Sequence, residues 1–354
     1  MTPITRRRLS NFKANKRAFW ALWIFLGLFI LSLFSEFIAN DKPIMVRYQN
    51  ETYYPIFNFY SEYDFGGDYQ TEADYLDPLV QCLIRSDGDT TCFDDDVAPQ
   101  GNGKITWAPV RYSFNTIAKE GNGSLNPPSK RHWFGTDTQS RDVFARVLYG
   151  FRLTVLFAFL VTFVTSIFAI FLGAVMGYFG GRVDLYLQRF VEIWSTMPTL
   201  FVIIILASFL NITFLVLAFI VTIFQWTGLV NLVRAEFLRA RNFEYVRAAK
   251  ALGVGDFTIM RRHVLPNAMV ATLTYMPFML TGAIGTLATL DYLGVGLPAA
   301  YPSLGEMAKE ARSVISSGWW LIWAAFVTYT IILTLLVFIF EGIRDAFDPR
   351  KVFK

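Results

Sequence analysis

Long uncharged apolar runs, separated by polar segments, dominate this chain. Residues 19–35 form the first run, residues 153–181 form the second, and residues 193–233 hold 41 residues without a charge. A helix crosses a bilayer core with about 20 residues, and 41 residues would make a helix of about 60 Å, so the third run predicts two spans. The turn between them is expected at Asn211 and Thr213. Runs at 268–290 and 319–340 bring the predicted total to six spans.

The polar segments differ in charge, and the difference predicts the side of the membrane on which each lies. Residues 1–18 carry six Arg or Lys and no acid, and residues 231–266 carry seven against three acids. Residues 41–130 carry fourteen acids against seven bases. Cytoplasmic segments are enriched in Lys and Arg, so we expect both termini and the 231–267 loop to be cytoplasmic, and residues 41–131 to be outside.

A cleaved signal peptide is the alternative reading of the first run. Signal-peptide cleavage sites prefer small residues at the first and third positions before the cut, and for a cut after Ala39 the third position is held by Phe37. We therefore expect an uncleaved anchor.

These patterns predict an all-α membrane protein with an enlarged outer domain of short strands and loops between the first two spans. The expected parts are a cytoplasmic tail at 1–18, a first span at 19–40, the outer domain at 41–131, an interfacial segment at 132–152, a core of five spans at 153–340 and a cytoplasmic tail at 341–354. Gly173 and Gly177 form a GxxxG pair, which favours close helix packing. A short inner turn is expected around 182–189.

Composition places the chain in the membrane class and excludes a soluble enzyme. Apolar residues make up 54% and charged residues 17%, against about a quarter charged in a typical globular protein. The positive excess lies mainly in the predicted cytoplasmic segments, so the net charge of +4 does not indicate nucleic-acid binding.

Few residues could carry catalytic or metal chemistry. The two histidines, His132 and His263, fall on opposite sides of the predicted membrane, and the HExxH, GxSxG and Walker A patterns are absent. We expect no catalytic residue, no metal site and no cofactor in this chain, so another chain would bind any ATP. Cys82 and Cys92 both fall in the outer domain, where a ten-residue spacing favours a disulfide, with two unpaired thiols as the alternative.

Residues 244–267, EYVRAAKALGVGDFTIMRRHVLPN, form the one long polar loop with helical periodicity. Within this loop, a spacing of i, i+3, i+4 and i+7 predicts one apolar face of a short helix. That face is made by Tyr245, Ala248, Ala249 and Leu252. Gly253 follows as a C-cap that can take a positive φ. Asp256 then caps a second short helix over 257–263, which Pro266 stops, so we expect a helix, a tight turn and a second helix.

This loop resembles the cytoplasmic EAA loop of bacterial ABC importer permeases, whose pattern is EAA, three residues, Gly, nine residues, Ile, one residue and Leu-Pro. Arg247 replaces the Glu and His263 replaces the Ile, as in the dipeptide and oligopeptide permease branch. The resemblance implies a coupling helix that sits in a groove of the ATPase subunit; a basic amphipathic hairpin on the membrane surface is the alternative. The predicted ATPase-coupling residues are Tyr245, Arg247, Ala248, Ala249, Leu252, Gly253, His263, Leu265 and Pro266.

Two further segments resemble the same branch. One signature of this branch reads GTD, two residues, GRD, and then an R and a YG pair. The chain has Ser140 in place of the usual Gly of GRD. The matching residues are Gly135, Thr136, Asp137, Arg141, Asp142, Arg146, Tyr149 and Gly150. We expect an interfacial helix here, in which Asp142 can pair with Arg146 four residues on. An ordinary helix entry with Asp137 as its cap is the alternative. The terminal DxxDPR string is matched by Asp345, Asp348, Pro349 and Arg350. A short helix is also expected at 304–313.

Together these resemblances identify the chain as a permease subunit of a peptide-type ABC importer with the type I fold. The long outer domain is similar to that of the Yej branch, which takes up peptides and the peptide-nucleotide microcin C. The resemblance implies a multi-pass protein of the bacterial inner membrane that works by alternating access. Its implied partners are membrane lipid, a second related permease, a periplasmic peptide-binding protein, and two ATPase subunits or one fused ATPase chain that would hold ATP and Mg. The fifth predicted span carries a weakly polar stripe on one face, which either lines the solute path or only packs against a neighbouring helix. The stripe consists of Thr274, Thr281, Gly285 and Thr289.

Two other protein classes compete with this interpretation. A secondary carrier or channel usually places ionisable residues at mid-membrane depth, and the six predicted spans contain none away from their ends. Sensitivity of transport to vanadate or to an uncoupler separates that class from an ABC importer. An intramembrane hydrolase would lack a usable base, because both histidines lie outside the predicted bilayer core.

Overall fold

The computed structural model describes residues 3–89, 101–118 and 123–347. The chain divides into two compact units. The first unit contains Met1–Phe29, Leu153–Lys309 and Phe326–Lys354. The second unit contains Ile30–Arg152 and Glu310–Ala325.

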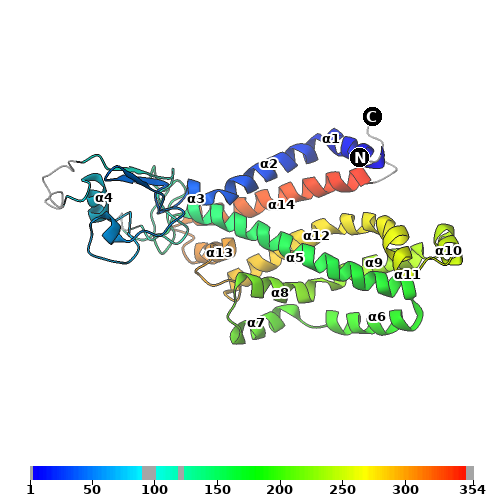
Figure 1. Ribbon diagram of the computed structural model, residues 1–354. Coiled ribbons are helices and arrows are strands. Elements are labelled where there is room, and N and C mark those ends of the chain that lie inside the picture. The colour runs from blue at the N-terminus through cyan, green and yellow to red at the C-terminus, as the bar shows by residue number, and fades with distance from the viewer. Residues whose placement is uncertain (1–2, 90–100, 119–122, 348–354) are drawn as a thin grey trace. The chain divides into compact units, whose positions relative to one another are not determined.

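Helices make up most of the described chain (Figure 1). In chain order they are α1 (Pro3–Ala14), α2 (Lys16–Leu33), α3 (Ser35–Ile38), the 3₁₀ helix η1 (Glu62–Phe65), α4 (Pro78–Arg85), α5 (Val143–Phe179), α6 (Gly181–Ser195), α7 (Thr199–Phe209), α8 (Phe214–Gln225), α9 (Thr227–Ala240), α10 (Glu244–Ala251), α11 (Asp256–Thr258), the π-helix η3 (Ile259–Val264), α12 (Leu265–Leu293), α13 (Leu304–Ser313) and α14 (Trp319–Phe347). By length and composition, four described helical runs could cross a membrane, or up to six if each of two bent pairs is one span.

The bent pairs show where the sequence interpretation was incomplete. Gly181–Ser195 is a helix, α6, and not the short turn expected at 182–189. Gly180 and Gly181, with φ of 63° and 53°, reverse the chain after α5, and Leu187 and Val191 then pack into the core at helical spacing. A bend of 72° separates α6 from α7, with Pro198 at the N-cap of α7. The break between α7 and α8 falls at 210–213, where the turn was expected.

The GxxxG pair brings α5 against α9. A Cβ added to Gly173 would lie 2.8 Å from the Val230 carbonyl oxygen, and one added to Gly177 would lie 2.5 Å from that of Arg234. Side chains of this size do not fit at such distances, so the close packing predicted for the two glycines is confirmed. Arg234 also donates to Asp184 on α6, with 2.7 Å between Nη2 and Oδ2.

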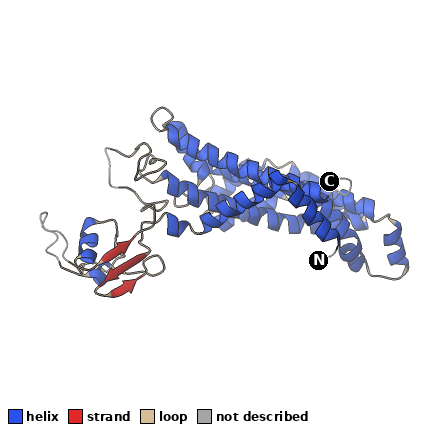
Figure 2. Cartoon of the chain, turned by 90° about the horizontal axis from the view of Figure 1, so that it is seen from above, coloured by secondary structure: helices blue, strands red, loops and turns tan. Residues whose placement is uncertain are grey.

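A small antiparallel sheet forms part of the second unit (Figure 2). Its strand order is β2-β1-β3, from β1 (Met45–Tyr48), β2 (Glu51–Tyr53) and β3 (Lys104–Thr106). Gln49 and Asn50, with φ of 48° and 63°, make the two-residue turn between β1 and β2. The buried Phe65 ring packs against aromatic side chains from the strands and from Tyr75.

The predicted disulfide involves one described cysteine. Cys82 lies on α4 and is almost fully buried. Cys92 lies outside the described residues, so the bond between the two stays a prediction.

Asp87 ties the hairpin turn to the start of β3 and should make the second unit sensitive to acid. Its carboxylate accepts the backbone N–H groups of Gln49 and Asn102, each at 2.9 Å. These bonds hold the pKa of Asp87 below its usual value. A lowered folded-state pKa adds stability above the unfolded pKa, about 3.9, and this stability is lost as the pH falls through the folded pKa.

We therefore expect Asp87→Asn to speed limited proteolysis of the second unit at pH 7, by weakening it by about 1 kcal/mol. The variant should also lose less stability than the wild type on acidification from pH 5 to pH 2. Asp68→Asn, which removes an exposed carboxylate from the same unit, is the control and should behave as wild type. Parallel acid profiles for wild type and Asp87→Asn would contradict this assignment.

Candidate functional site

Residues 241–267 follow α9 and run into the first turn of α12, and we name them the coupling segment. The first helix of this segment, α10, ends in a Schellman motif. The Gly253 N–H donates to the Lys250 carbonyl oxygen at 3.0 Å, and the Val254 N–H donates to that of Ala249 at 3.1 Å. Leu252 is the C-cap, and Gly253 follows it with φ of 76°. These two bonds form a Schellman motif, which needs a left-handed residue at the Gly253 position. The predicted positive φ is confirmed.

The two sides of α10 have different environments. Val246 and Ala249 are buried, in a core that also contains Phe237, Ile259 and Val264. Residues exposed on the same helix include Tyr245, Arg247 and Ala248. The single apolar face expected for this helix is therefore wrong, because the i, i+3 pair that packs is Val246 and Ala249.

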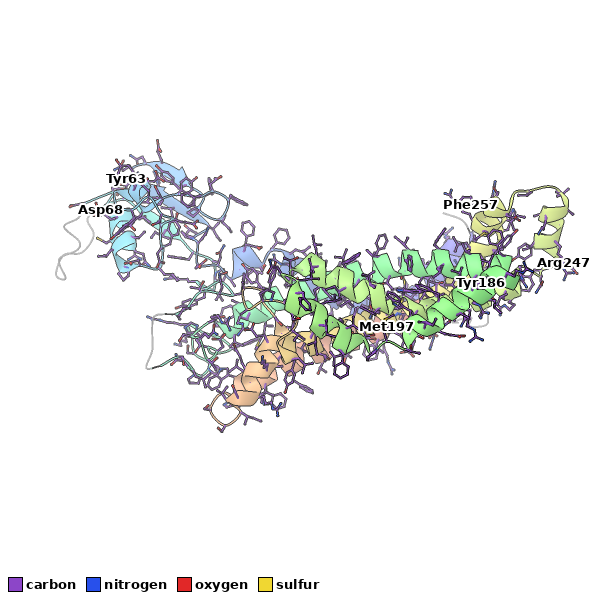
Figure 3. The ribbon with its side chains drawn as sticks, turned by 90° about the horizontal axis from the view of Figure 1, so that it is seen from below. Tyr63, Asp68, Tyr186, Met197, Arg247 and Phe257 are labelled. Atoms are coloured by element: carbon purple, nitrogen blue, oxygen red, sulfur yellow. The ribbon has the colours of Figure 1, made fainter. Side chains whose placement is uncertain are left out.

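Two large apolar side chains of the coupling segment point away from its core. Leu252 is 83% exposed and Phe257 is 69% exposed. Leu252 follows the last residue of α10 and so leaves the helical periodicity that buries Ala249. Arg247 and Phe257 lie at the end of the first unit that also holds α1 (Figures 1 and 3). The surface around them is basic, with exposed side chains of Arg247, Lys250, Arg261 and Arg262.

Hydrogen bonds tie the coupling segment to the end of α5. The Tyr178 hydroxyl donates to Asp256 Oδ1 at 2.6 Å, and Arg241 Nη1 donates to the Tyr178 carbonyl oxygen at 3.5 Å. The predicted cap role of Asp256 is wrong, because Gly255 is the N-cap of α11 and the Asp256 carboxylate faces Tyr178. Tyr178 thus binds both the first residue of the segment and the first residue of α11.

Pro266 does not stop a helix as expected. The helical run continues from α11 through η3 into α12, and Pro266 lies in the first turn of α12. Proline fits a first helical turn because its missing N–H needs no partner there, and the wider π turn before it leaves room for the ring. His263 and Leu265 are half-buried, and Asn267 Nδ2 donates to the Tyr245 hydroxyl at 3.0 Å and to the His263 carbonyl oxygen at 3.2 Å.

Comparisons with known proteins agree with this arrangement. Residues 169–352 match the family described as "Binding-protein-dependent transport system inner membrane component". The chain belongs to this family. The permease is 48% identical over 352 residues to the "Inner membrane ABC transporter permease protein YejE" of Escherichia coli K12, covering 99% of this chain and 98% of the relative.

Further relatives and one solved structure fit the same family. The "Peptidoglycan transport system permease protein YejE" of Agrobacterium fabrum is 47% identical over 378 residues, covering 100% of this chain and 95% of the relative. The "Dipeptide transport system permease protein DppC" of Bacillus subtilis is 35% identical over 227 residues, covering 63% and 70%. The MetNI methionine ABC transporter structure has a TM-score of 0.50 and 17% identity, covering 57% of this chain and 96% of its own, and supports the type I permease fold.

The stripe predicted on the fifth span of the permease lies on α12. Thr274 and Thr281 are half-buried, whereas Gly285 and Thr289 are exposed. Each threonine hydroxyl donates to the carbonyl oxygen four residues earlier, at 2.8 to 3.0 Å. This leaves a weakly polar, narrow helix surface whose role stays a prediction.

The GTD segment of the permease forms a buried charge network in the second unit. Asp137, with no exposed surface, accepts from Arg141 Nε at 2.7 Å and from Arg146 Nη1 at 2.5 Å. Both arginines also donate to Glu310 on α13, at 2.7 and 3.0 Å. Asp142, and not Asp137, caps α5, because its Oδ1 accepts the Ala145 N–H at 2.8 Å.

The sequence interpretation missed three residues of these sites. Glu310 lies 164 residues beyond Arg146, and no local spacing indicates their pairing. Phe257 had a usable signal, since it is a large apolar residue in a polar, basic stretch. Tyr178, at the end of an apolar run, gave no indication of its bond to Asp256.

Proposed function

We propose that the chain is one permease subunit of an ATP-driven importer for peptides. Its relatives are named for dipeptide and peptidoglycan transport, so oligopeptides and peptide conjugates, including those of the microcin C type, are the substrates expected here. The chain supplies the transmembrane path and a contact for a separate ATPase, and ATP with Mg belongs to that partner.

The observation that carries this proposal is the exposed apolar pair of the coupling segment. Leu252 and Phe257 stand on a basic surface at an end of the first unit, whereas Val246 and Ala249 anchor α10 in the core. An exposed apolar side chain rimmed by polar residues favours a protein contact. The ATPase is the partner expected at this place from the EAA spacing.

Six spans with both termini cytoplasmic suit this role. The bent pairs α6 with α7 and α8 with α9 then count as one span each, and the coupling segment faces the cytoplasm with α1 and the carboxyl end of α14. One permease forms half of a pathway, so a second related permease completes it. The α12 stripe of Thr274, Thr281, Gly285 and Thr289 faces the peptide path between them.

The proposed mechanism is alternating access. A periplasmic binding protein delivers the peptide to the outer side, and the ATPase subunits close on ATP. The coupling segment moves with the ATPase and passes that motion to α5 and α12, to which it is bonded and packed.

Leu252→Glu tests the proposal. Burying a leucine in an interface contributes about 1.5 to 3 kcal/mol to binding. The amount of ATPase subunit that copurifies with the variant from native membranes should therefore fall by about tenfold or more. ATP-driven peptide uptake should fall in parallel, while the amount of inserted permease stays unchanged. Leu79→Glu, at an exposed leucine of α4, is the matched control. Normal ATPase retention and uptake by Leu252→Glu would overturn the proposed contact.

A further inference from the structure

A loop of the second unit, directly after β2, is aromatic and uncharged. Residues 54–59 read YPIFNF, and we name them the aromatic loop. Tyr54 is exposed, Phe57 is 70% exposed and Phe59 is 64% exposed. No step of the transport mechanism above involves these side chains. Clustered apolar side chains on a protein surface mark contacts with other proteins or with membranes, and the neighbours of the loop decide between the two.

The backbone of the aromatic loop is held in a turn. The Phe57 N–H donates to the Tyr54 carbonyl oxygen at 3.0 Å. Tyr53 and Tyr60 flank the loop, and their rings pack on each other with 5.1 Å between centres. Both rings also pack on the buried Phe65. The exposed rings therefore project from a fixed turn whose two ends are anchored in the core of the unit.

The Phe57 ring lies at the end of the first long apolar helix. It packs edge-on against Phe37 of α3, with 5.9 Å between ring centres, and Phe37 packs on Phe34 at 6.2 Å. Phe34 directly follows α2 and is exposed. The last turn of α2 belongs to the same unit, and its exposed apolar residues are Ile30, Leu31 and Leu33. The aromatic loop therefore extends the apolar surface of α2, which in an inner-membrane permease contacts lipid.

An ion pair beside Phe37 indicates its depth in the membrane. Arg152 Nη1 donates to both oxygens of the Glu36 carboxylate, at 2.8 and 3.1 Å. Glu36 is the first charged residue after the first apolar run, and Arg152 is the last one before the second. Charged residues are costly in the hydrocarbon core, so this pair marks its boundary. Phe37 follows Glu36 and holds Phe57 near this boundary, the depth at which interfacial segments insert their apolar side chains.

We propose that the aromatic loop inserts into the membrane leaflet on the side of the second unit. Phe57 and Phe59 would lie among the lipid headgroups and the first acyl carbons, and the loop has no charge that insertion would desolvate. A protein interface surrounds its apolar centre with a polar rim, whereas this loop borders the apolar surface of α2, which favours lipid over protein. Lipid contact of this kind goes beyond the proposed function and does not depend on which solute is imported.

Depth measurement with a nitroxide label tests the proposal. The full chain carries Asn58→Cys, labelled between the two exposed rings, and is reconstituted in vesicles of phosphatidylethanolamine and phosphatidylglycerol. Collision rates with oxygen, which concentrates in lipid, and with a nickel chelate, which stays in water, give the depth of the label. We expect about 5 to 10 Å into the boundary between headgroups and acyl chains. The unsubstituted chain, labelled in parallel, gives the contribution of Cys82 and Cys92.

A label at Asp68→Cys is the control for exposure to water. Asp68 is exposed, and residues 61–68 contain three acids. Tyr63 and Asp68 lie in the same part of the second unit (Figure 3). Acidic residues avoid the membrane, so this label should collide freely with the nickel chelate. Equal nickel collision rates for the labels at positions 58 and 68 would overturn the insertion.

Two matched pairs of substitutions test whether the aromatic rings cause the insertion. Phe57→Ser with Phe59→Ser should raise the nickel collision rate of the label at position 58 to that of the label at position 68. Tyr63→Ser with Tyr69→Ser removes two rings of the same unit with similar exposure, 67% and 65%, and should leave the depth unchanged. Equal depth in the two pairs would contradict the role of the rings. A label that stays in water until a second permease or a binding protein is added would also overturn the proposal, because a protein would then be the occupant.

Discussion

Gly253→Val should abolish ATP-driven peptide uptake, whereas Gly255→Val, two residues away, should leave it close to wild type. Gly253 has φ of 76°, a conformation that costs a β-branched residue about 1 to 3 kcal/mol. Valine would therefore open the Schellman motif and displace Leu252 and α10 from the position that meets the ATPase. Gly255 has φ of −63°, which any residue adopts.

The pair is matched because crowding is the same at both glycines. A Cβ added to either one meets no atom within 4 Å, so only the backbone conformation differs. Uptake and ATP hydrolysis should both be measured in proteoliposomes that contain the whole importer, with the amount of inserted permease as a control. Gly253→Asn should fall between the two, since asparagine tolerates the left-handed region. Wild-type uptake by Gly253→Val would show that this turn does not position the contact.

Asp137→Ala should destabilise the second unit by about 3 to 5 kcal/mol, because it removes the buried carboxylate that Arg141 and Arg146 share. Arg146 is 1% exposed and Arg141 is 5% exposed, so water cannot replace the lost charge. Thermal unfolding of the purified chain should show a lower melting temperature, and the yield of monodisperse protein should fall.

Charge balance provides the control for this prediction. In Asp137→Asn with Arg141→Gln, Arg146 keeps Glu310 as its charged partner, and the melting temperature should recover most of the loss. Asp68→Ala, at an exposed acid, should have no effect. If the double variant unfolds as early as Asp137→Ala, the loss comes from packing and not from the change in charge balance.

Local backbone chemistry made part of the fold predictable. Gly253 needs a positive φ after a helical segment, and the chain provides it. The helix at Leu304–Ser313 coincides with the predicted range, and Gly173 and Gly177 pack where a GxxxG pair is expected to pack. In each case a residue type and its spacing determine the geometry without help from distant segments.

The errors arose where tertiary contacts override local signals. Asp256 follows a glycine and precedes a helix, as a cap would, but the Tyr178 hydroxyl, 78 residues away, binds its carboxylate. Pro266 resembles a stop signal, and only the π turn before it lets the helix continue. α6 is amphipathic and its polar residues resembled a turn, but Asp184 among them binds Arg234 of another helix.

The candidate site was predictable in position but not in orientation. The EAA spacing located residues 244–267, yet it could not tell that Ala249 is buried and that Leu252 is exposed. That difference depends on where α10 stops, and a helix end is set by the Schellman bonds of Gly253 and Val254. The proposed contact surface therefore includes Phe257, which the spacing does not mark.

The uninterrupted path from α11 through η3 into α12 also determines the angular setting of α12. Ile259–Val264 is a π turn, whose hydrogen bonds span one residue more than those of an α-helix. Each residue of an α-helix turns the chain by about 100°, so inserting one further residue between Ile259 and Val264 would rotate the threonine surface of α12 by about that angle relative to the buried Ile259. Removing one residue would instead let the run close as an ordinary α-helix. A substitution here alters a contact, but an insertion would redirect an entire helix.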